Sequence, residues 1–307
     1  MSDPHITILM ATYNGAQYLP AQLNSLLAQT HKNWSLVVSD DGSRDSTVPL
    51  LLAFDKAHPK HPLHLINGPR QGSPSRNFMS MLTRIHLPEG MVALADQDDV
   101  WLPNKLARAV DYLAHCPDNV PAIYASESIL TDKKLAYLHQ KNAKPSRPSF
   151  RNALVQNLFS GHSTVLNATA VDLVRSAGYP RTIAFHDWWL YQLVAGAGGL
   201  CMLDPTQTAL YRQHGRNVFG ASHGVQGAIK RLQHLVCNDY GAWLAGHWQA
   251  LHEARHHLTP EARALVGELL DQFSQEPRAT QFRRLGLHRA SAKGTAALWL
   301  AARLGWV

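Results

Sequence analysis

The sequence predicts an α/β protein whose central sheet is mostly parallel and flanked by helices. Short strand-like runs alternate with segments of helical spacing through the first 120 residues. Such alternation implies crossover connections, which make neighbouring strands parallel and cover both faces of the sheet. Polar residues follow three of the strand-like runs, and ligands bind beyond the carboxyl ends of strands in sheets of this kind. We therefore expect a ligand site at one edge of the sheet.

The individual elements can be placed by their apolar spacing. The predicted strands are residues 5–14, 34–43, 64–69 and 91–99, and the predicted helices are residues 16–30, 44–54, 75–85 and 102–116. Beyond residue 123 we expect a strand that runs into a helix over 161–178, a helix over 186–199 and a bent hairpin over 200–214. From residue 222 onward the chain is predicted to be helical and basic.

Composition describes an ordinary globular protein, with 45% hydrophobic and 17% charged residues. The net charge of +7 suggests an anionic partner, and residues 277–307 contain six Lys or Arg and no Asp or Glu. We expect no nucleic acid, which would require basic and aromatic residues interleaved on one surface. The longest apolar run is too short to span a bilayer, and we expect no secretory signal. The three cysteines form no CxxC pair and indicate reduced thiols in a cytoplasmic protein.

The stretch "ALADQDDVW" ends an apolar run in Asp96, Asp98 and Asp99. Carboxylates this close repel one another unless water or a cation neutralises them. A calcium loop starting at Asp96 would need an oxygen ligand and then glycine where Val100 and Trp101 stand. No G-x-G-x-x-G follows the first strand, so a dinucleotide site is not indicated. Two interpretations stay open: a solvated turn before the next helix, or a Mg²⁺ or Mn²⁺ site shared with substrate phosphates.

A second metal motif is present by spacing alone. His252, Glu253 and His256 satisfy H-E-x-x-H, which can present two imidazoles to zinc on one helix. The segment lies in the basic helical region, away from the predicted sheet edge, and histidines are frequent in this chain. We therefore expect a solvated helix face there rather than a zinc site.

Three segments together carry a family resemblance. "ITILMATYNGAQYL", "VVSDDGSRDST" and "ALADQDDVWLPNKL", in this order, resemble the inverting GT-A glycosyltransferases of the large nucleotide-sugar transferase family two. The resemblance covers residues 5–220 and extends to bacterial O-antigen and exopolysaccharide transferases, including rhamnosyltransferases. It implies a Rossmann-like GT-A catalytic domain over 1–220, with a nucleotide-binding half (1–120) and an acceptor-binding half (121–220). A basic helical C-terminal region over 221–307 would follow.

The resemblance also implies roles for individual residues on the donor side. Those assigned to the donor nucleotide are Thr12, Tyr13, Asn14, Asp40, Asp41, Arg76, Asn77 and Asp96. Mn²⁺ or Mg²⁺ is assigned to Asp98 and His214, with Asp96 as a further candidate ligand. Asp99 would support a neighbouring ligand or cap the next helix. From the residues alone, a turn with an N-cap also explains the Asp40–Ser43 group, and a helix N-terminus explains Arg76 and Asn77 nearly as well as a donor contact does.

On the acceptor side the resemblance identifies Asp187, in "HDWW", as the catalytic base. Trp188 and Trp189 could stack on a sugar and desolvate Asp187, and core packing is the alternative. Arg212 or Arg216 would neutralise phosphate, with a surface loop as the competing interpretation. Gly161 would belong to an acceptor-facing segment.

Single-sugar transfer is expected, because processive relatives carry Q-x-x-R-W and transmembrane helices, both missing here. The expected donor is dTDP-rhamnose or a UDP-hexose, and the expected acceptor is a glycan linked to undecaprenyl diphosphate. The basic, tryptophan-containing tail suggests a peripheral contact with the inner face of the cytoplasmic membrane. Packing of the tail on the catalytic domain or in a homodimer is the alternative. An inactive scaffold and a nucleotidyltransferase are the rival functions.

Overall fold

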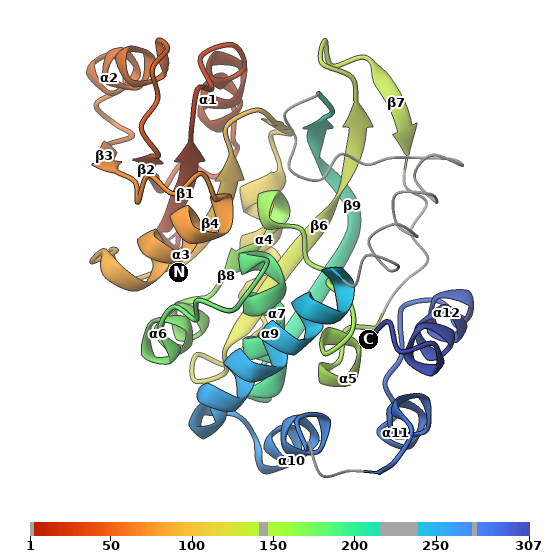
Figure 1. Cartoon of the computed structure of the whole chain (residues 1–307). Coiled ribbons are helices and arrows are strands. Elements are labelled where there is room, and N and C mark those ends of the chain that lie inside the picture. The colour runs from red at the N-terminus through yellow and green to blue at the C-terminus, as the bar shows by residue number, and fades with distance from the viewer. Residues whose placement is uncertain (1–2, 141–146, 215–238, 272–274) are drawn as a thin grey trace.

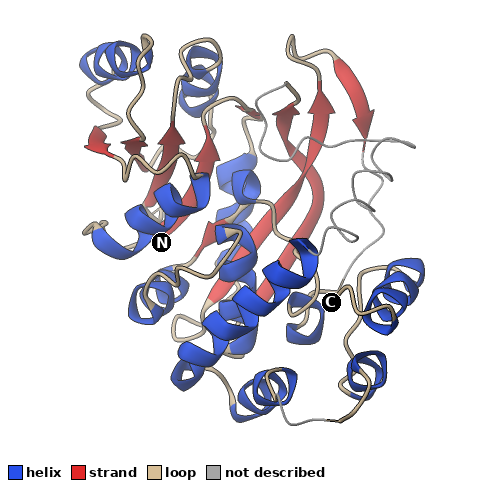
Figure 2. Cartoon of the chain, viewed as in Figure 1, coloured by secondary structure: helices blue, strands red, loops and turns tan. Residues whose placement is uncertain are grey.

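The computed structural model describes residues 3–140, 147–214, 239–271 and 275–307. Its centre is a mixed sheet in the order β3-β2-β1-β4-β8-β6-β9-β5, with β7 paired to β6 (Figures 1 and 2). The strands are β1 Ile6–Thr12, β2 Trp34–Asp40, β3 Leu63–Asn67, β4 Met91–Asp96, β5 Val100–Trp101, β6 Ala122–Thr131, β7 Tyr137–Gln140, β8 Val165–Leu166 and β9 Leu200–Arg212. β1 to β4 are parallel to one another, as the alternation of strands and helices predicts.

Helices cover both faces of the sheet. They are α1 Leu19–Leu27, α2 Thr47–Ala57, α3 Pro74–Arg84, α4 Lys105–Leu113, α5 Phe150–Ala153, α6 Ala168–Ala177, α7 His186–Gly196, α9 Asp239–Glu253, α10 Pro260–Leu269, α11 Arg278–Arg284 and α12 Ala292–Arg303. Alternate residues of β1 point to opposite faces: Ile8 packs with α1, α2 and α4, whereas Leu9 packs with α3, α6 and α7. A strand buried on both faces needs a continuous apolar run, which "ITILM" supplies.

The segment predicted as a bent hairpin is one long strand, so that prediction is wrong. β9 runs parallel to β6 along its whole length, with register shifts opposite residues 126–128. The bend arises inside the strand, where the Asp204 carboxylate accepts the Thr206 N–H at 2.9 Å. Pro205 lies between them and reads as a turn residue in the sequence, which explains the error.

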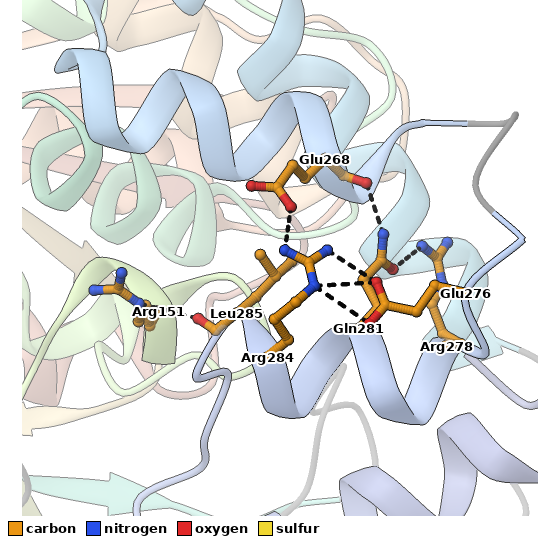
Figure 3. Close-up of polar contacts among 7 residues, drawn as sticks. All are labelled: Arg151, Glu268, Glu276, Arg278, Gln281, Arg284 and Leu285. Carbon is orange, nitrogen blue, oxygen red and sulfur yellow. Dashed lines mark hydrogen bonds and ion pairs between the residues drawn. The ribbon is translucent and has the colours of Figure 1, made fainter.

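The C-terminal helices pack on the body formed by the sheet and its flanking helices, one of the three arrangements left open for the tail. Phe282, Leu285 and Leu298 belong to the same apolar cluster as β1 and α7. Figure 3 shows the ion pairs that hold α11 against α10: Arg284 of α11 pairs with Glu268 of α10 at 2.6 Å, and it also pairs with Glu276 at 2.9 Å. Arg284 is therefore neutralised internally, and it contributes little to the positive charge that the tail presents outward.

The structure also bears on the H-E-x-x-H spacing of His252 and His256. α9 ends at Glu253 and a 3₁₀ turn covers Arg255–His257, so His252 and His256 do not share one continuous α-helix. This agrees with the rejection of the H-E-x-x-H zinc motif, which needs that helix.

Among the described residues, no helix combines the length and the apolar character needed to cross a bilayer.

Candidate active site at the carboxyl edge of the sheet

β1, β2 and β4 end side by side, with Thr12 opposite Asp40 and Ala11 opposite Asp96 in the strand register. We call the edge formed by these strand ends the carboxyl edge. The Asp40 carboxylate, which is buried, accepts hydrogen bonds from the Thr12 hydroxyl at 2.9 Å and the Ser43 hydroxyl at 2.6 Å. It also accepts the backbone N–H of Ser43 at 2.8 Å. Asp40 thus connects the end of β1 to the loop after β2, and its hydrogen bonds to Ser43 are those of a turn.

The loops beside Asp40 are fixed by two more polar side chains. Asp41 accepts the backbone N–H groups of Arg70 at 2.5 Å and Gly72 at 2.8 Å, which holds the loop after β3. Asn14 has a φ of +47°, and its side-chain oxygen accepts the Arg44 N–H at 2.8 Å. Donor contacts by Asp40, Asp41 and Asn14 stay predictions.

Tyr13 is the residue of this group that faces outward, with 52% of its surface exposed. Its backbone N–H donates to the Gln97 side-chain oxygen at 3.0 Å, and its carbonyl accepts the Gln97 amide at 3.1 Å. A Cβ on Gly15 would lie 2.0 Å from the Gln97 oxygen, so a side chain at this position would displace the Gln97 amide from Tyr13. Sequence reasoning missed Gln97, because its partner is 84 residues away and nothing local indicates the pairing.

The structure brings together acids from segments far apart in the chain. Burial, followed by the charges of Asp98 and Asp187, raises the pKa of Asp96 to about 7. Asp96 ends β4 and Asp98 lies in the turn after it, whereas Asp187 lies in the first turn of α7. The metal and base candidates therefore share one site, and a carboxyl of raised pKa between two others is typical of functional sites.

Asp98 and His214 form the outer part of the site. The imidazole Nε2 lies 2.7 Å from the Asp98 carboxylate, and the two side chains are 10% and 17% exposed. The His214 ring stacks on Tyr18 with centroids 4.9 Å apart. A carboxylate beside an imidazole, both reachable from solvent, fits Mn²⁺ or Mg²⁺ that keeps positions free for phosphate oxygens.

Asp99 forms the inner part and is fully buried. It does not cap the next helix; one oxygen accepts the Arg212 N–H at 3.1 Å and the other has no hydrogen-bond partner. Burial and the neighbouring acids hold the pKa of Asp99 well above its usual range. Ligand atoms of Asp96, Asp99 and His162 lie within 4.8 Å of one another, so these three could also hold a metal. Sequence reasoning gave His162 no role.

Asp187 is held by backbone contacts at the N-terminus of α7. Its carboxylate accepts the Gly161 N–H at 3.0 Å and the Trp188 N–H at 2.8 Å. His186 beside it stacks on Phe78 with centroids 4.5 Å apart, and burial lowers its pKa, which favours the neutral ring. The half-buried Asp187 carboxylate is therefore held in a fixed orientation, as a general base requires.

Two sequence predictions for the acceptor side are wrong. Trp188 and Trp189 are 3% and 0% exposed, and the Trp188 indole donates to the Ala153 carbonyl at 2.7 Å, so neither ring can stack on a sugar. Arg212 is 4% exposed and is not presented to a diphosphate. Its guanidinium donates to the carbonyls of Asp98 and Lys133, each at 2.7 Å.

Three further residues were predicted to bind donor or phosphate, and the structure places two of them on α3. Asn77 is buried and donates to the Ser39 carbonyl at 2.9 Å, which fixes α3 to the end of β2. Arg76 is exposed on α3 and donates to Gln71 at 2.6 Å. Arg216 lies outside the described residues.

Gly161→Ala should reduce transfer strongly while leaving the fold intact. A Cβ at Gly161 would lie 2.8 Å from His186 Nε2, so either the buried His186 ring or the Gly161 backbone, whose N–H orients Asp187, must shift. Gly267→Ala is the matched control, because that helical position has no atom within 4 Å and should gain about 0.5–1 kcal/mol of stability. Equal activity of Gly161→Ala and wild type would show that this contact does not position the base.

Metal affinity should rise with pH through about 7, because Asp96 must lose its proton before it can face a cation. A carboxyl pKa raised in the folded state also means that metal-free protein loses stability as pH rises from about 4 towards 7. Thermal melting in EDTA should show this slope more strongly in wild type than in Asp96→Asn. Identical pH profiles for the two proteins would contradict the raised pKa.

Comparisons with known proteins agree with this geometry. Residues 7–169, slightly more than half of the chain, match the family described as glycosyl transferase family 2. The chain is 29% identical over 243 residues to the dTDP-rhamnosyl transferase RfbG of Shigella flexneri, covering 75% of this chain and 80% of that one. It is 29% identical over 168 residues to UDP-Glc:alpha-D-GlcNAc-diphosphoundecaprenol beta-1,3-glucosyltransferase WfgD of Escherichia coli, covering 54% and 61%.

Solved structures show the same fold at low sequence identity. The mannosyltransferase PcManGT from Pyrobaculum calidifontis, in complex with GDP-Man and Mn²⁺, aligns with a TM-score of 0.55 and 18% identity, over 99% of this chain and 87% of that one. S. aureus TarS in complex with UDP-GlcNAc aligns with a TM-score of 0.54 and 16% identity, over 92% and 80%. The chain therefore has the GT-A fold and belongs to glycosyl transferase family 2, as a nucleotide-sugar glycosyltransferase.

Proposed function

We propose that this glycosyltransferase inverts the anomeric centre as it moves one sugar from a nucleoside diphosphate donor to a glycan hydroxyl. The observation that carries the proposal is the meeting of Asp96, Asp98 and Asp187 at the carboxyl edge, where burial and then the charges of the other two raise the pKa of Asp96. One oriented carboxylate beside a cation-binding pair of side chains suits a single displacement.

Donor binding is assigned to the ends of β1 and β2. Tyr13 is exposed and its backbone is fixed by Gln97, so its ring can lie against a base without further ordering of the backbone. Relatives are named for dTDP-rhamnose and UDP-Glc, which supports dTDP-rhamnose or a UDP-hexose as the donor.

Two groups of side chains could hold a cation: Asp98 with His214, and Asp96 with Asp99 and His162. We assign the metal to Asp98 and His214, with Asp96 as a further ligand. Asp99 is fully buried, whereas Asp98 and His214 retain exposed surface. Mn²⁺ or Mg²⁺ bound there would offset charge on the leaving diphosphate, an effect of roughly several kcal/mol.

Asp187 is assigned as the general base. Its two backbone hydrogen bonds fix the direction in which a free lone pair of the carboxylate points. The base accepts the proton of the acceptor hydroxyl as that oxygen attacks the anomeric carbon opposite the diphosphate. The product is then an inverted glycosidic bond and a free nucleoside diphosphate.

The acceptor is proposed to be a glycan linked to undecaprenyl diphosphate in bacterial surface polysaccharide synthesis. The name of one relative, a glucosyltransferase acting on a diphosphoundecaprenol, supports this class. Cytoplasmic location, contact with an anionic membrane through the C-terminal helices and formation of a homodimer belong to the proposal as well.

The membrane contact can be tested without disturbing packing. Leu300 on α12 and Leu304, the residue that caps the C-terminus of this helix, are 56% and 50% exposed, although other residues of α12 are buried. Leu300→Gln/Leu304→Gln should weaken sedimentation with phosphatidylglycerol vesicles by about tenfold, because burying two leucines supplies a few kcal/mol. Leu52→Gln, with 56% exposure on α2, is the matched control. Unchanged sedimentation of the double variant would reject α12 as the contact.

A transfer assay tests the proposed function. Purified protein would be incubated with dTDP-rhamnose, UDP-Glc, UDP-GlcNAc or GDP-Man, together with Mn²⁺ and a sugar linked to a lipid diphosphate. The expected result is nucleotide release from one donor that requires the acceptor, with an inverted anomeric configuration by NMR. A product of retained configuration would contradict Asp187 as a base in a single displacement.

A further inference from the structure

An open cavity of about 510 Å³ lies along the outer face of α3, outside the acidic site. α3 contributes Arg76, Thr83 and Arg84, and α6 contributes Arg175. The loops after β3 and α6 add Gln71, Gly178, Tyr179 and Arg181. Four guanidinium groups therefore surround one space, and no lining residue is acidic.

The charge of this arginine cavity is not neutralised from within the chain. Across the part of the chain that the structure describes, no ion pair joins any of its four arginines to a carboxylate. Arg175 donates to the carbonyls of Leu82 and Ile85, and Arg76 donates to the Gln71 side chain. The phenol of Tyr179 lies among Arg76, Arg84 and Arg181 and is a further donor. Cationic groups that converge without a carboxylate to neutralise them favour a multivalent anion.

The arginine cavity is coupled to the proposed base by direct contacts. Ser75, next to Arg76 on α3, accepts the His186 backbone N–H at 3.2 Å and donates to the Ala184 carbonyl at 3.2 Å. His186 immediately precedes Asp187, so one wall of the cavity and the helix that carries the base are joined at their N-termini. An anion held here would lie beside the contact between α3 and the N-terminus of α7, the helix whose first turn carries Asp187.

We propose that the arginine cavity binds the diphosphate of a lipid-linked acceptor. This inference rests on the proposed function, in which the acceptor sugar is attached through a diphosphate. The volume exceeds what a single phosphate needs, and several arginines can each pair with two phosphate oxygens. Holding the diphosphate would position the attached sugar relative to Asp187, and it would favour a diphosphate-linked acceptor over a free glycan.

The first test is titration of inorganic pyrophosphate in EDTA, which excludes metal-mediated binding at the acidic site. Arg84→Gln/Arg181→Gln should weaken binding by about tenfold or more, since each charge-assisted contact is a strong one. Arg303→Gln, an exposed arginine on α12, is the control and should bind as wild type does. Arg84→Lys/Arg181→Lys keeps the charge but loses the paired geometry, so an intermediate affinity is expected. Equal affinity of all four proteins would overturn the proposal.

The second test separates a lipid diphosphate from negative charge in general. Phosphatidylcholine vesicles would carry either undecaprenyl diphosphate or phosphatidylglycerol at equal charge. Wild type should sediment preferentially with the diphosphate lipid, and Arg84→Gln/Arg181→Gln should lose that preference. Equal sedimentation of wild type with both vesicles would reject the diphosphate assignment. Neither test requires sugar transfer, so the arginine cavity can stand if the transfer assay fails, and it can fail while transfer proceeds.

Discussion

Asp187→Asn is expected to lower the rate of transfer by about 10²- to 10⁴-fold, because the amide cannot accept the acceptor's proton. The substitution keeps the side-chain shape, and its oxygen can still accept the Gly161 N–H. Donor affinity should therefore change little. The rate would be measured as nucleotide release with saturating donor and acceptor, and donor affinity by calorimetry.

Asp172→Asn is the control, because Asp172 is an exposed acid on α6 outside the site. It should match wild type in both measurements. A large loss of donor affinity in Asp187→Asn would place Asp187 on the nucleotide side instead. Full activity of that variant would remove it from the mechanism.

Asp98→Asn is expected to abolish metal-dependent donor binding and to reduce transfer by a factor comparable to that of Asp187→Asn. Loss of this carboxylate removes the charge that faces the cation on the exposed side of the site. Mn²⁺ binding would be followed by electron paramagnetic resonance or calorimetry in the presence of the preferred nucleotide.

The same measurement on Asp99→Asn separates the two groups of candidate ligands. Asp99 is fully buried and its pKa is raised, which favours a neutral carboxyl that an amide replaces with little electrostatic change. Asp99→Asn should retain most of its Mn²⁺ affinity, and His162→Gln should do so as well. Loss of Mn²⁺ in Asp99→Asn with retention in Asp98→Asn would move the metal to the group of Asp96, Asp99 and His162.

The parallel half of the fold was predictable because its signals are local. The apolar run of β1 and the polar residues at its end indicate both a buried strand and the edge where it stops. The register that sets Thr12 opposite Asp40 follows once neighbouring strands are parallel. The site at the carboxyl edge could therefore be located from the sequence.

The errors came from features that depend on packing in three dimensions. The roles of Trp188 and Trp189 were misjudged, although α7 offers a signal: the helix is apolar on nearly all sides, which is typical of a buried helix. His162 lies in the 3₁₀ turn Gly161–Ser163, just before β8, and the fold brings it close to Asp99. No spacing rule in the sequence indicates that the two residues are neighbours. Arg212 resembles a phosphate ligand in the sequence, but it bonds to nearby carbonyls in the fold.

The arginine cavity was not predictable from composition for a similar reason. The positive excess in the sequence is concentrated in residues 277–307, yet Arg284 there is paired with Glu268 and Glu276. Arg84, Arg175 and Arg181 are spread over nearly a hundred residues that also contain acids, so their convergence depends on how α3 packs against α6.

Calorimetric titration of the protein with UDP, dTDP, GDP and CDP, each in Mn²⁺ and in EDTA, tests the central claim most directly. The account predicts that one of these nucleotides binds in Mn²⁺, that its affinity falls sharply in EDTA, and that Asp98→Asn removes the difference. Equal affinity in Mn²⁺ and EDTA, or binding of none of the four nucleotides, would contradict a metal-dependent nucleoside diphosphate site at the carboxyl edge.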